Sequence, residues 1–481
     1  MGNINSPQII AVDLDGTITL TDTFHESVIA LIRNKPLFLL LLPLWLARGI
    51  AFLKLKVAEN TLLDVTILPY NFPFIDWLRE QKASGKTIIL CTAANESIAL
   101  AVAKHLNIFD DVIASNANTN LKSAKKRRAL EEKYGERGFD YAGNSAADVE
   151  VWAGACHAIV VNASSALHTK MTRIASVSHT FPSESVRLSH WCKALRVHQW
   201  VKNLLLFVPI LAAHHFGNVQ SLTTLLIAFM SFSLCASSVY IINDLLDLES
   251  DRQHLRKKNR PFASAKLTIA VGIAIVPLLI SLSIALGVMV GKDFLIVLIL
   301  YFLITIAYSL VFKNVVLVDC LILASLYTVR IIAGAAAASL SLSFWLLSFS
   351  IFIFLSLALV KRYAELMVQD QAGKSFMHGR GYIISDASLL QTFGVSSGYI
   401  SALVFALYMR SEDILSLYVK PTAIWLFLPI LLFWVSWVWL KASRGEMHDD
   451  PIIFAAKDKA SLIVAVLTTL VFAYAATGFK T

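Results

Sequence analysis

Two groups of carboxylates in this chain have the types and spacing that metal or phosphate chemistry requires. Asp13 and Asp15 follow the apolar run "IIAV", and "YIINDLLDLESDRQ" carries Asp244, Asp247 and Asp251 after a long apolar stretch. The last three are spaced i, i+3 and i+7, which places them on one helical face. Clustered carboxylates repel one another unless a cation lies between them, and oxygen ligands favour Mg²⁺. We expect a nucleophile or acid–base pair in the first group and a Mg²⁺ site in the second.

A cationic cluster comes directly after the second group. It consists of Arg252, Arg256, Lys257, Lys258 and Arg260. Asn243 lies four residues before Asp247 and joins the face of the aspartates. Acids that hold Mg²⁺ beside groups that hold anionic oxygens are typical of a diphosphate site. The alternative is a helix end with ordinary topology charges, but that does not require three aligned aspartates.

The composition places much of the chain in lipid. Hydrophobic residues make up 57% of the 481 residues and charged residues only 16%, with a mean hydropathy of +0.65. A soluble domain carries about 25% charged residues. The net charge of +9 fits basic cytoplasmic loops or a protein that binds anionic phosphates, and we expect no nucleic-acid partner. Five scattered cysteines indicate neither a disulfide framework nor a zinc site.

The apolar residues divide the chain into three parts. Residues 1–165 read as a soluble α/β domain, 166–200 as a linker with an amphipathic entry, and 201–481 as an all-α membrane bundle. The bundle is expected to have nine spans, at about 202–217, 222–243, 267–290, 294–312, 315–337, 342–360, 388–409, 421–440 and 460–479. The loops after even-numbered spans hold 15 Lys and Arg against 3 in the others, which predicts a cytoplasmic soluble domain at an inner membrane.

The soluble part resembles the haloacid dehalogenase-like (HAD) hydrolases over residues 7–163. Four motifs occur in order, three of them at strand ends: "DLDGT", Thr92 in "IILCTAAN", Lys122 in "NLKSAKK", and "GNSAAD" with Asn144 and Asp148. The resemblance implies that Asp13 attacks phosphorus and that Asp15 is the general acid and base. Thr92 and Lys122 would hold the phosphoryl oxygens, and Mg²⁺ would lie between Asp13, the Asp15 carbonyl and the last motif.

The last motif departs from the family, because Asn144 stands where an aspartate is usual. A decayed phosphatase that serves as a scaffold is therefore the alternative. A cap, residues 18–86, lies between the first two motifs and contains the apolar stretch 35–56. Since Asp13 and Thr92 must share one site, that stretch cannot cross the bilayer once. We interpret it as a hairpin at the lipid interface. The alternative is a helical cap that packs on its own domain.

The membrane part resembles the UbiA-type intramembrane prenyltransferases. The aspartate motif after the second span, "NDLLDLESD", carries the likeness, and "RVHQWVKN", "RKKNRPFAS", "YSLVFKNVVLVD" and "KRYAEL" resemble the decaprenyl-phosphate phosphoribosyltransferase branch. That branch implies transfer of phosphoribose from 5-phosphoribosyl diphosphate to a polyprenyl phosphate, with Mg²⁺ on Asp244, Asp247 and Asp251. Candidates for substrate phosphates are Arg260, Lys313, Lys361 and Arg362, and candidates for positioning are Tyr308, Asp319, Arg330 and Glu365, although each of these could instead pair helices or extend to the interface.

A fused phosphatase could remove the 5-phosphate from such a lipid product, which gives a polyprenyl-phosphoryl-ribose for cell-surface polysaccharide. One alternative is a prenyltransferase with a prenyl diphosphate donor and an aromatic or other acceptor, but the loop after the sixth span is more basic than acidic. Another is a non-catalytic scaffold or transporter, which would not need the aligned aspartates. The sequence leaves the oligomeric state open.

Overall fold

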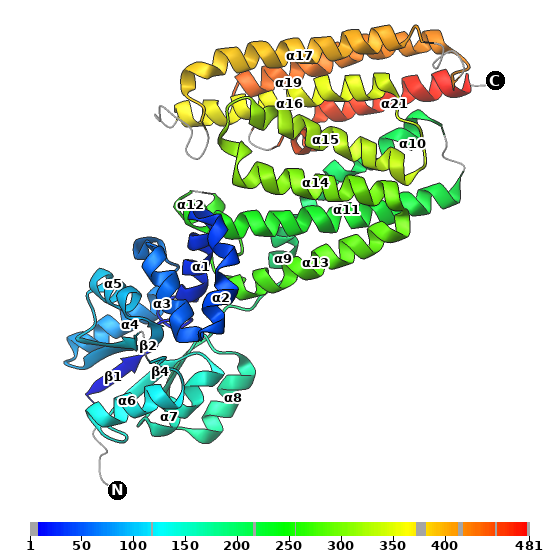
Figure 1. Cartoon of the computed structure of the whole chain (residues 1–481). Helices are drawn as coiled ribbons and strands as arrows, with labels where there is room; N and C mark the ends of the chain where they lie inside the picture. The colour runs from blue at the N-terminus through cyan, green and yellow to red at the C-terminus, as the bar shows by residue number, and fades with distance from the viewer. Residues whose placement is uncertain are drawn as a thin grey trace. The chain divides into compact units, whose positions relative to one another are not determined.

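The computed structural model describes residues 8–116, 119–214, 218–254, 256–371, 381–411, 417–447 and 450–478. The chain divides into two compact units (Figure 1). The first comprises Met1–Leu195 and Tyr240–Val276, and the second comprises Arg196–Val239 and Pro277–Thr481. The segment that carries the three aspartates of the membrane part therefore packs with the N-terminal domain.

A parallel six-stranded sheet forms the centre of the first unit, in the order β3-β2-β1-β4-β5-β6. The strands are β1 (Ile9–Val12), β2 (Thr87–Asn95), β3 (Asp111–Ser115), β4 (Asp140–Gly143), β5 (Ala158–Val161) and β6 (Val177–Phe181). β1 lies between β2 and β4, so the carboxyl ends of these three strands are adjacent. Ligands of open parallel sheets bind at that edge.

Helices cover both faces of the sheet because alternate strand residues point to opposite sides. Ile10 and Val12 pack with α4 (Phe72–Ala83) and α5 (Glu96–Leu106). Ala11 packs on the other side, in a cluster to which the remaining helices contribute Leu130, Val151, Trp152 and Met171. Those helices are α6 (Ala124–Tyr134), α7 (Val149–Gly154) and α8 (Ser165–Ile174).

Part of the segment expected to be a linker belongs to this fold. α8 and β6 lie within 166–200, and β6 pairs with β5 through residues such as Ile159 and His179. This strand is hard to predict from its residues, because "VSHTF" is short, polar and exposed at the sheet edge. Its pairing depends on β5 and not on its own pattern.

The cap segment between β1 and β2 is helical. It contains α1 (Thr23–Asn34), η1 (Pro36–Leu40), α2 (Leu42–Ala47) and α3 (Ile50–Asn60), followed by α4. Phe38, Leu42 and Trp45 pack on residues of α1 and α3. The other side of the hairpin formed by η1 and α2 exposes Leu37, Leu39, Leu40, Leu41, Leu44 and Leu46, between 36% and 78% of each residue. A soluble domain rarely leaves such a continuous apolar patch uncovered.

The second unit is helical. Eight helices of the described residues are long and apolar enough to cross a membrane, and they include α11 (Val219–Leu246), α13 (Ile269–Val290), α14 (Lys292–Leu310), α15 (Val318–Ala337), α16 (Phe344–Gln371), α17 (Ala387–Tyr408), α19 (Phe427–Ser443) and α21 (Lys459–Thr477). The first expected span coincides with the shorter apolar helix Val197–Ala212, formed by η4 and α10. Residues 215–217 at its expected end lie outside the described residues. The ninth span therefore stays a prediction.

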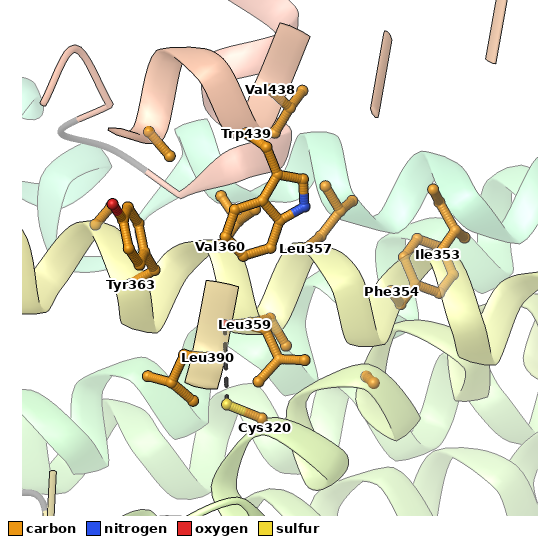
Figure 2. Packing of buried hydrophobic residues seen from close by; sticks show 14 of the residues in the cluster. Cys320, Ile353, Phe354, Leu357, Leu359, Val360, Tyr363, Leu390, Val438 and Trp439 are labelled. Carbon is orange, nitrogen blue, oxygen red and sulfur yellow. Dashed lines mark hydrogen bonds between the residues drawn. The ribbon is translucent and has the colours of Figure 1, made fainter. Parts of the chain in front are cut away.

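Small residues bring three helices of this unit close together. Figure 2 shows Trp439 of α19 beside Leu357 and Val360 of α16. A Cβ atom at Gly394 of α17 would lie 2.0 Å from the Trp439 ring, so only glycine fits there. Trp439 donates its indole N–H to Ser356 Oγ at 3.1 Å, and Ser356 donates to the Gly394 carbonyl at 2.6 Å. In membrane bundles such close contacts and hydrogen bonds hold helices together.

Candidate active sites

The first candidate site lies at the carboxyl ends of β1, β2 and β4. Asp13 follows β1, and its backbone N–H donates to the Ala142 carbonyl at 2.9 Å. Thr92 lies near the end of β2 and is fully buried. Asn144 follows β4 and packs on Gly16, where a Cβ atom would lie 1.9 Å from the Asn144 amide nitrogen. The strand order thus brings together residues of three sequence motifs.

The lysine that contacts Asp13 is Lys126, whereas the sequence motif pointed to Lys122. Lys126 Nζ lies 2.9 Å from Asp13 Oδ1, 2.9 Å from Tyr141 Oη and 3.7 Å from Asp148 Oδ1. Lys122 is exposed in the loop before α6 and has no recorded contact with Asp13. The contact of Lys126 has a geometric reason: this residue lies in the first turn of the helix, where its buried side chain reaches the strand ends.

Asp148 is held in place by neighbouring donors. Its Oδ2 accepts hydrogen bonds from the Asn144 N–H at 3.2 Å, the Ser145 N–H at 2.9 Å and Ser145 Oγ at 2.8 Å. Tyr141 Oη donates to Oδ1 at 2.8 Å. Asp148 therefore serves to shape the loop that presents Asn144. Asp13, the Asp15 carbonyl and the Asn144 amide oxygen are a donor set of the kind that Mg²⁺ takes.

The two acids of the first motif differ from ordinary carboxyls. Burial raises the pKa of Asp13 to about 6, although the charge of Lys126 opposes the shift and the Asp148 carboxylate adds to it. Burial and the nearby Asp22 carboxylate raise the pKa of Asp15 to about 7, against a hydrogen bond of 2.8 Å from the Thr23 N–H. A nucleophile that is ionised and an acid that keeps its proton near neutral pH suit phosphoryl transfer.

The cap adds a cation that the sequence patterns did not single out. Lys54 of α3 donates from Nζ to the Ala93 carbonyl at 2.7 Å, one residue after Thr92. Burial lowers the pKa of Lys54, while the Asp15 and Asp22 carboxylates oppose that shift. Its ammonium group is therefore near enough to the acids to interact with them and with a phosphate that they would receive.

The second candidate site is the segment after α11. Asp244 and Asp251 are both buried and converge on Arg260, whose NH1 lies 3.1 Å from Asp244 Oδ1 and 2.5 Å from Asp251 Oδ2. Burial raises the pKa of Asp251, against the charge of Arg260, and the Asp244 carboxylate adds to the rise. Asp244 and Asp251 thus direct one oxygen each toward a single positive charge. A divalent ion could take the place of that charge, because Mg²⁺ prefers carboxylate oxygens as ligands.

The helix expected across all three aspartates is interrupted. α11 ends at Leu246, Asp247 caps α12 (Leu248–Gln253), and Asn243 is partly buried. The backbone nevertheless continues with helical spacing, since the N–H of Asp247 donates to the Asn243 carbonyl at 2.9 Å and that of Asp251 to the Asp247 carbonyl at 2.8 Å. Asp244 and Asp251 are thus brought together as predicted, and Asp247 lies at the junction between them.

In the second unit, two lysines and a tyrosine surround one buried acid. Lys202 Nζ lies 2.7 Å and Lys361 Nζ 3.2 Å from Asp450 Oδ2, and Tyr327 Oη donates to the same carboxylate at 3.1 Å. Burial disfavours the charge of Asp450, but Lys361 and Lys202 outweigh it and hold its pKa below the usual range. Among the residues predicted from sequence, only Lys361 belongs to this cluster.

The other predicted polar residues of this unit pair helices. Arg362 is fully buried and contacts Asp319, Glu365 Oε2 at 2.6 Å and Tyr308 Oη at 2.9 Å, so it joins α14, α15 and α16. Arg330 donates to Asn203 Oδ1 at 2.9 Å and to Tyr301 Oη at 3.1 Å. Lys313 is partly buried in η6 (Phe312–Asn314), which connects α14 and α15. The helix-pairing alternative therefore describes the contacts of Arg362.

Eight membrane-length helices among the described residues define a multi-pass membrane protein, which also carries a parallel α/β domain. Residues 204–454 match the model of the UbiA prenyltransferase family, and the chain belongs to that family. It is 34% identical over 468 residues to an uncharacterized protein, y4nM, of Sinorhizobium fredii, which covers 96% of this chain and 90% of that protein. The resemblance identified from the aspartate motif is thereby confirmed.

The chain is also similar to a named transferase and to a solved membrane-protein structure. The chain is 35% identical over 185 residues to decaprenyl-phosphate phosphoribosyltransferase of Mycobacterium tuberculosis, over 38% of this chain and 61% of that protein. The structure of a UbiA homolog from Archaeoglobus fulgidus bound to GPP and Mg²⁺ gives a TM-score of 0.45 at 15% identity, over 59% of this chain and 98% of that one.

Proposed function

We propose that this protein transfers 5-phosphoribose from phosphoribosyl diphosphate to a polyprenyl phosphate and that its N-terminal domain then removes the 5-phosphate. The observation that carries the first step is the convergence of buried Asp244 and Asp251 on Arg260. The similarity to a decaprenyl-phosphate phosphoribosyltransferase supports this choice of substrates over others in the family.

The transfer needs a leaving diphosphate and an aligned acceptor. Asp244, Asp247 and Asp251 would hold Mg²⁺, which neutralises the charge that develops on diphosphate as it departs. Arg260 would move from the two carboxylates to the diphosphate oxygens, since the metal competes for the same acids. The acceptor phosphate is already an anion, so the site needs no strong general base.

The lysines on Asp450 are a suitable place for an anionic group of a substrate. A buried acid that two ammonium groups hold keeps both of them charged and oriented inside the unit. A phosphate that binds there would meet Lys202 and Lys361 ready positioned, with Tyr327 as a further donor. Preorganised cations lower the barrier because they need not reorient when charge moves.

The second step is hydrolysis of a phosphate monoester. Asp13 would attack phosphorus and form an aspartyl-phosphate, while Asp15 protonates the departing alcohol. Lys126 would balance the charge of the phosphoryl oxygens. Asp15 would then remove a proton from the attacking water, which returns both carboxyls to their starting states. The product would be a polyprenyl-phosphoryl-ribose.

The exposed leucines of the cap suit a substrate in the membrane. We propose that the hairpin formed by η1 and α2 lies in the lipid interface on the cytoplasmic side, where Lys35 and Arg48 flank its apolar surface. A domain that rests there would act on a phosphate group attached to a lipid. A soluble phosphatase would gain nothing from this patch.

Transfer of a prenyl group is the second candidate function, because the family as a whole is named for it. The same acids would hold the diphosphate of a prenyl donor. The last two turns of α16 carry Glu365 and Asp370, while residues 372–380, which follow the helix, lie outside the described residues. An assay with both donors separates the two functions.

A double-label assay tests both steps at once. The purified chain in nanodiscs receives polyprenyl phosphate and phosphoribosyl diphosphate with ¹⁴C in the ribose and ³²P in the 5-phosphate. We expect ¹⁴C in the lipid phase only with Mg²⁺, and ³²P that enters the lipid and then leaves it as inorganic phosphate. The proposal fails if ¹⁴C stays in the aqueous phase while a prenyl diphosphate donor is consumed.

Variants assign each step to its site. Asp13→Asn should retain ³²P on the lipid, whereas Asp244→Asn and Asp251→Asn should lose both labels from it. Exposed aspartates outside either site supply matched controls, namely Asp76→Asn on α4 and Asp293→Asn at the start of α14. If Asp13→Asn releases ³²P at the rate of the parent chain, the N-terminal domain is not the phosphatase.

A further inference from the structure

Two ion pairs connect a helix of the proposed phosphatase domain with a helix of the proposed diphosphate site. α1 of the cap contributes Glu26 and Arg33, and α12 of the aspartate segment contributes Arg252 and Glu249. Arg252 NH2 lies 2.5 Å from Glu26 Oε1, and Arg33 NH1 lies 2.8 Å from Glu249 Oε2. Each helix supplies one acid and one base, so the two pairs have opposite polarity. All four residues belong to the first compact unit.

The two pairs differ in burial. The side chains of Glu26 and Arg252 are 4% and 8% exposed, whereas those of Arg33 and Glu249 are 38% and 47% exposed. An exposed pair contributes little, but a buried one is costly to break because each partner then leaves an uncompensated charge. The Glu26–Arg252 contact is therefore the one on which the arrangement of this segment depends.

Arg252 uses its whole guanidinium group. NH1 and NH2 donate to the two oxygens of Glu26 at 3.1 and 2.5 Å, and Nε donates to the Ala263 carbonyl at 3.0 Å. The Ala263 bond closes the segment that begins at Asp251 and contains Arg260. Arg252 thus fixes both ends of the segment that positions a carboxylate and its cation.

Glu26 is in turn fixed by the phosphatase-like domain. Thr21 Oγ1 donates to Glu26 Oε1 at 2.7 Å, and Thr23 at the start of α1 donates its N–H to Asp15. The carboxylate of Glu26 therefore reaches Arg252 from a helix whose first turn is anchored in the first catalytic motif. Its role goes beyond the shape of the cap.

We infer that Glu26 is a positioning residue for the diphosphate site: through Arg252 it holds the segment that presents Asp251 and Arg260, so the transferase step requires the N-terminal domain. The inference rests on the proposed metal-assisted transfer but not on the identity of the donor. It also gives a reason for the fusion that is independent of the phosphatase reaction.

The test is a Mg²⁺ titration of the transferase rate with the full chain in nanodiscs. Glu26→Gln and Arg252→Gln should each raise the half-saturating Mg²⁺ concentration by about tenfold or more, as loss of a group that orients a metal ligand does. The double variant should be no worse than either single one, because both remove one contact. Arg33→Gln, on the exposed pair of the same helices, should stay within about twofold of the parent chain.

A conservative variant guards against loss of folding. Glu26→Asp keeps the charge and should give a smaller rise than Glu26→Gln at an unchanged melting temperature. If Glu26→Gln does not yield folded protein, Glu26→Asp is read alone, and an unchanged Mg²⁺ requirement overturns the inference. Additive effects of Glu26→Gln and Arg252→Gln would overturn it too.

The outcome is separable from that of the proposed function. Should the parent chain transfer no label from phosphoribosyl diphosphate, the proposed substrate is wrong, and the same titration is made with the prenyl diphosphate that it consumes. Any diphosphate donor needs the metal on Asp244 and Asp251. An unchanged Mg²⁺ requirement in folded Glu26→Gln contradicts the inference with either donor.

Discussion

Lys126 is the residue on which the charge balance of the first site depends. It lies between the carboxylates of Asp13 and Asp148, and both partners raise its pKa although burial opposes that rise. The lysine therefore stays charged in a site where an incoming phosphate adds further negative charge. Lys122, the lysine of the sequence motif, is exposed four residues earlier.

We expect Lys126→Met to lower the rate of ³²P release by about 10²-fold or more, because it removes the cation that stabilises charge on the phosphoryl group. Lys122→Met should change the rate by less than about threefold, as surface substitutions usually have small effects. Both rates are measured as single-turnover release of ³²P by the full chain with Asp244 intact. An equal loss in Lys122→Met would restore that residue to the site.

The pH dependence of the phosphatase should follow Asp15. Its pKa of about 7 means that about half of the Asp15 carboxyls carry their proton at neutral pH. Protonation of the leaving alcohol needs that proton, so the rate should fall as the pH rises above about 7, with a second limb as Asp13 gains a proton below about 6. The measurement is the rate of hydrolysis of a soluble phosphate monoester as a function of pH between about 5 and 9, a range that covers both limbs.

At the scale of elements, the hairpin formed by η1 and α2 has one packed face and one exposed face. Phe38, Leu42 and Trp45 pack inward, and the leucines of the other face have no covering element among the described residues. The described residues of this chain include eight membrane-length helices, so lipid is the expected partner of an apolar surface of this kind.

Substitution of the outer leucines should impair action on lipid substrates alone. Leu40 and Leu44 are 73% and 63% exposed, and Leu40→Gln with Leu44→Gln should raise the KM for the lipid-linked phosphate by about thirtyfold or more, since each buried leucine stabilises interfacial binding by about 1 kcal/mol or more. Hydrolysis of a soluble monoester should not change. Leu100→Gln on α5 is the matched control, and equal losses on both substrates would show that the hairpin only supports the fold.

Elements with their own sequence patterns could be predicted, and contacts between distant elements could not. Sequence motifs predicted Asp13 and Asp15 at the end of the first strand, and also Thr92 and Asn144. The length of the apolar stretches predicted eight spans that the described residues contain. Lys202 and Asp450 are 248 positions apart, and Glu26 and Arg252 are 226 apart, so no local pattern connects them. Lys126 was missed because the motif offered several lysines and only the helix register selects one.

On the scale of the whole molecule, the proposed function joins two reactions whose substrates would meet in a membrane. The product of the proposed transferase would be the substrate of the proposed phosphatase, and one chain would supply both sites. A tether raises the effective concentration of the second site above that of a separate enzyme.

Trans-complementation within full-length chains measures this benefit. An Asp13→Asn chain forms the phosphorylated lipid, and an Asp244→Asn chain in the same vesicle can remove its phosphate only after the lipid has diffused to it. At equal numbers of working phosphatase sites, we expect the intact chain to clear ³²P from the lipid faster than the mixture by about tenfold or more at low protein density, because effective concentrations of tethered sites reach the millimolar range. The advantage should shrink as more chains share a vesicle, since diffusion then supplies the substrate. Equal clearance at every density would mean that the lipid is released before it is dephosphorylated, and the two domains would then be joined for the structural reason that Glu26 and Arg252 provide.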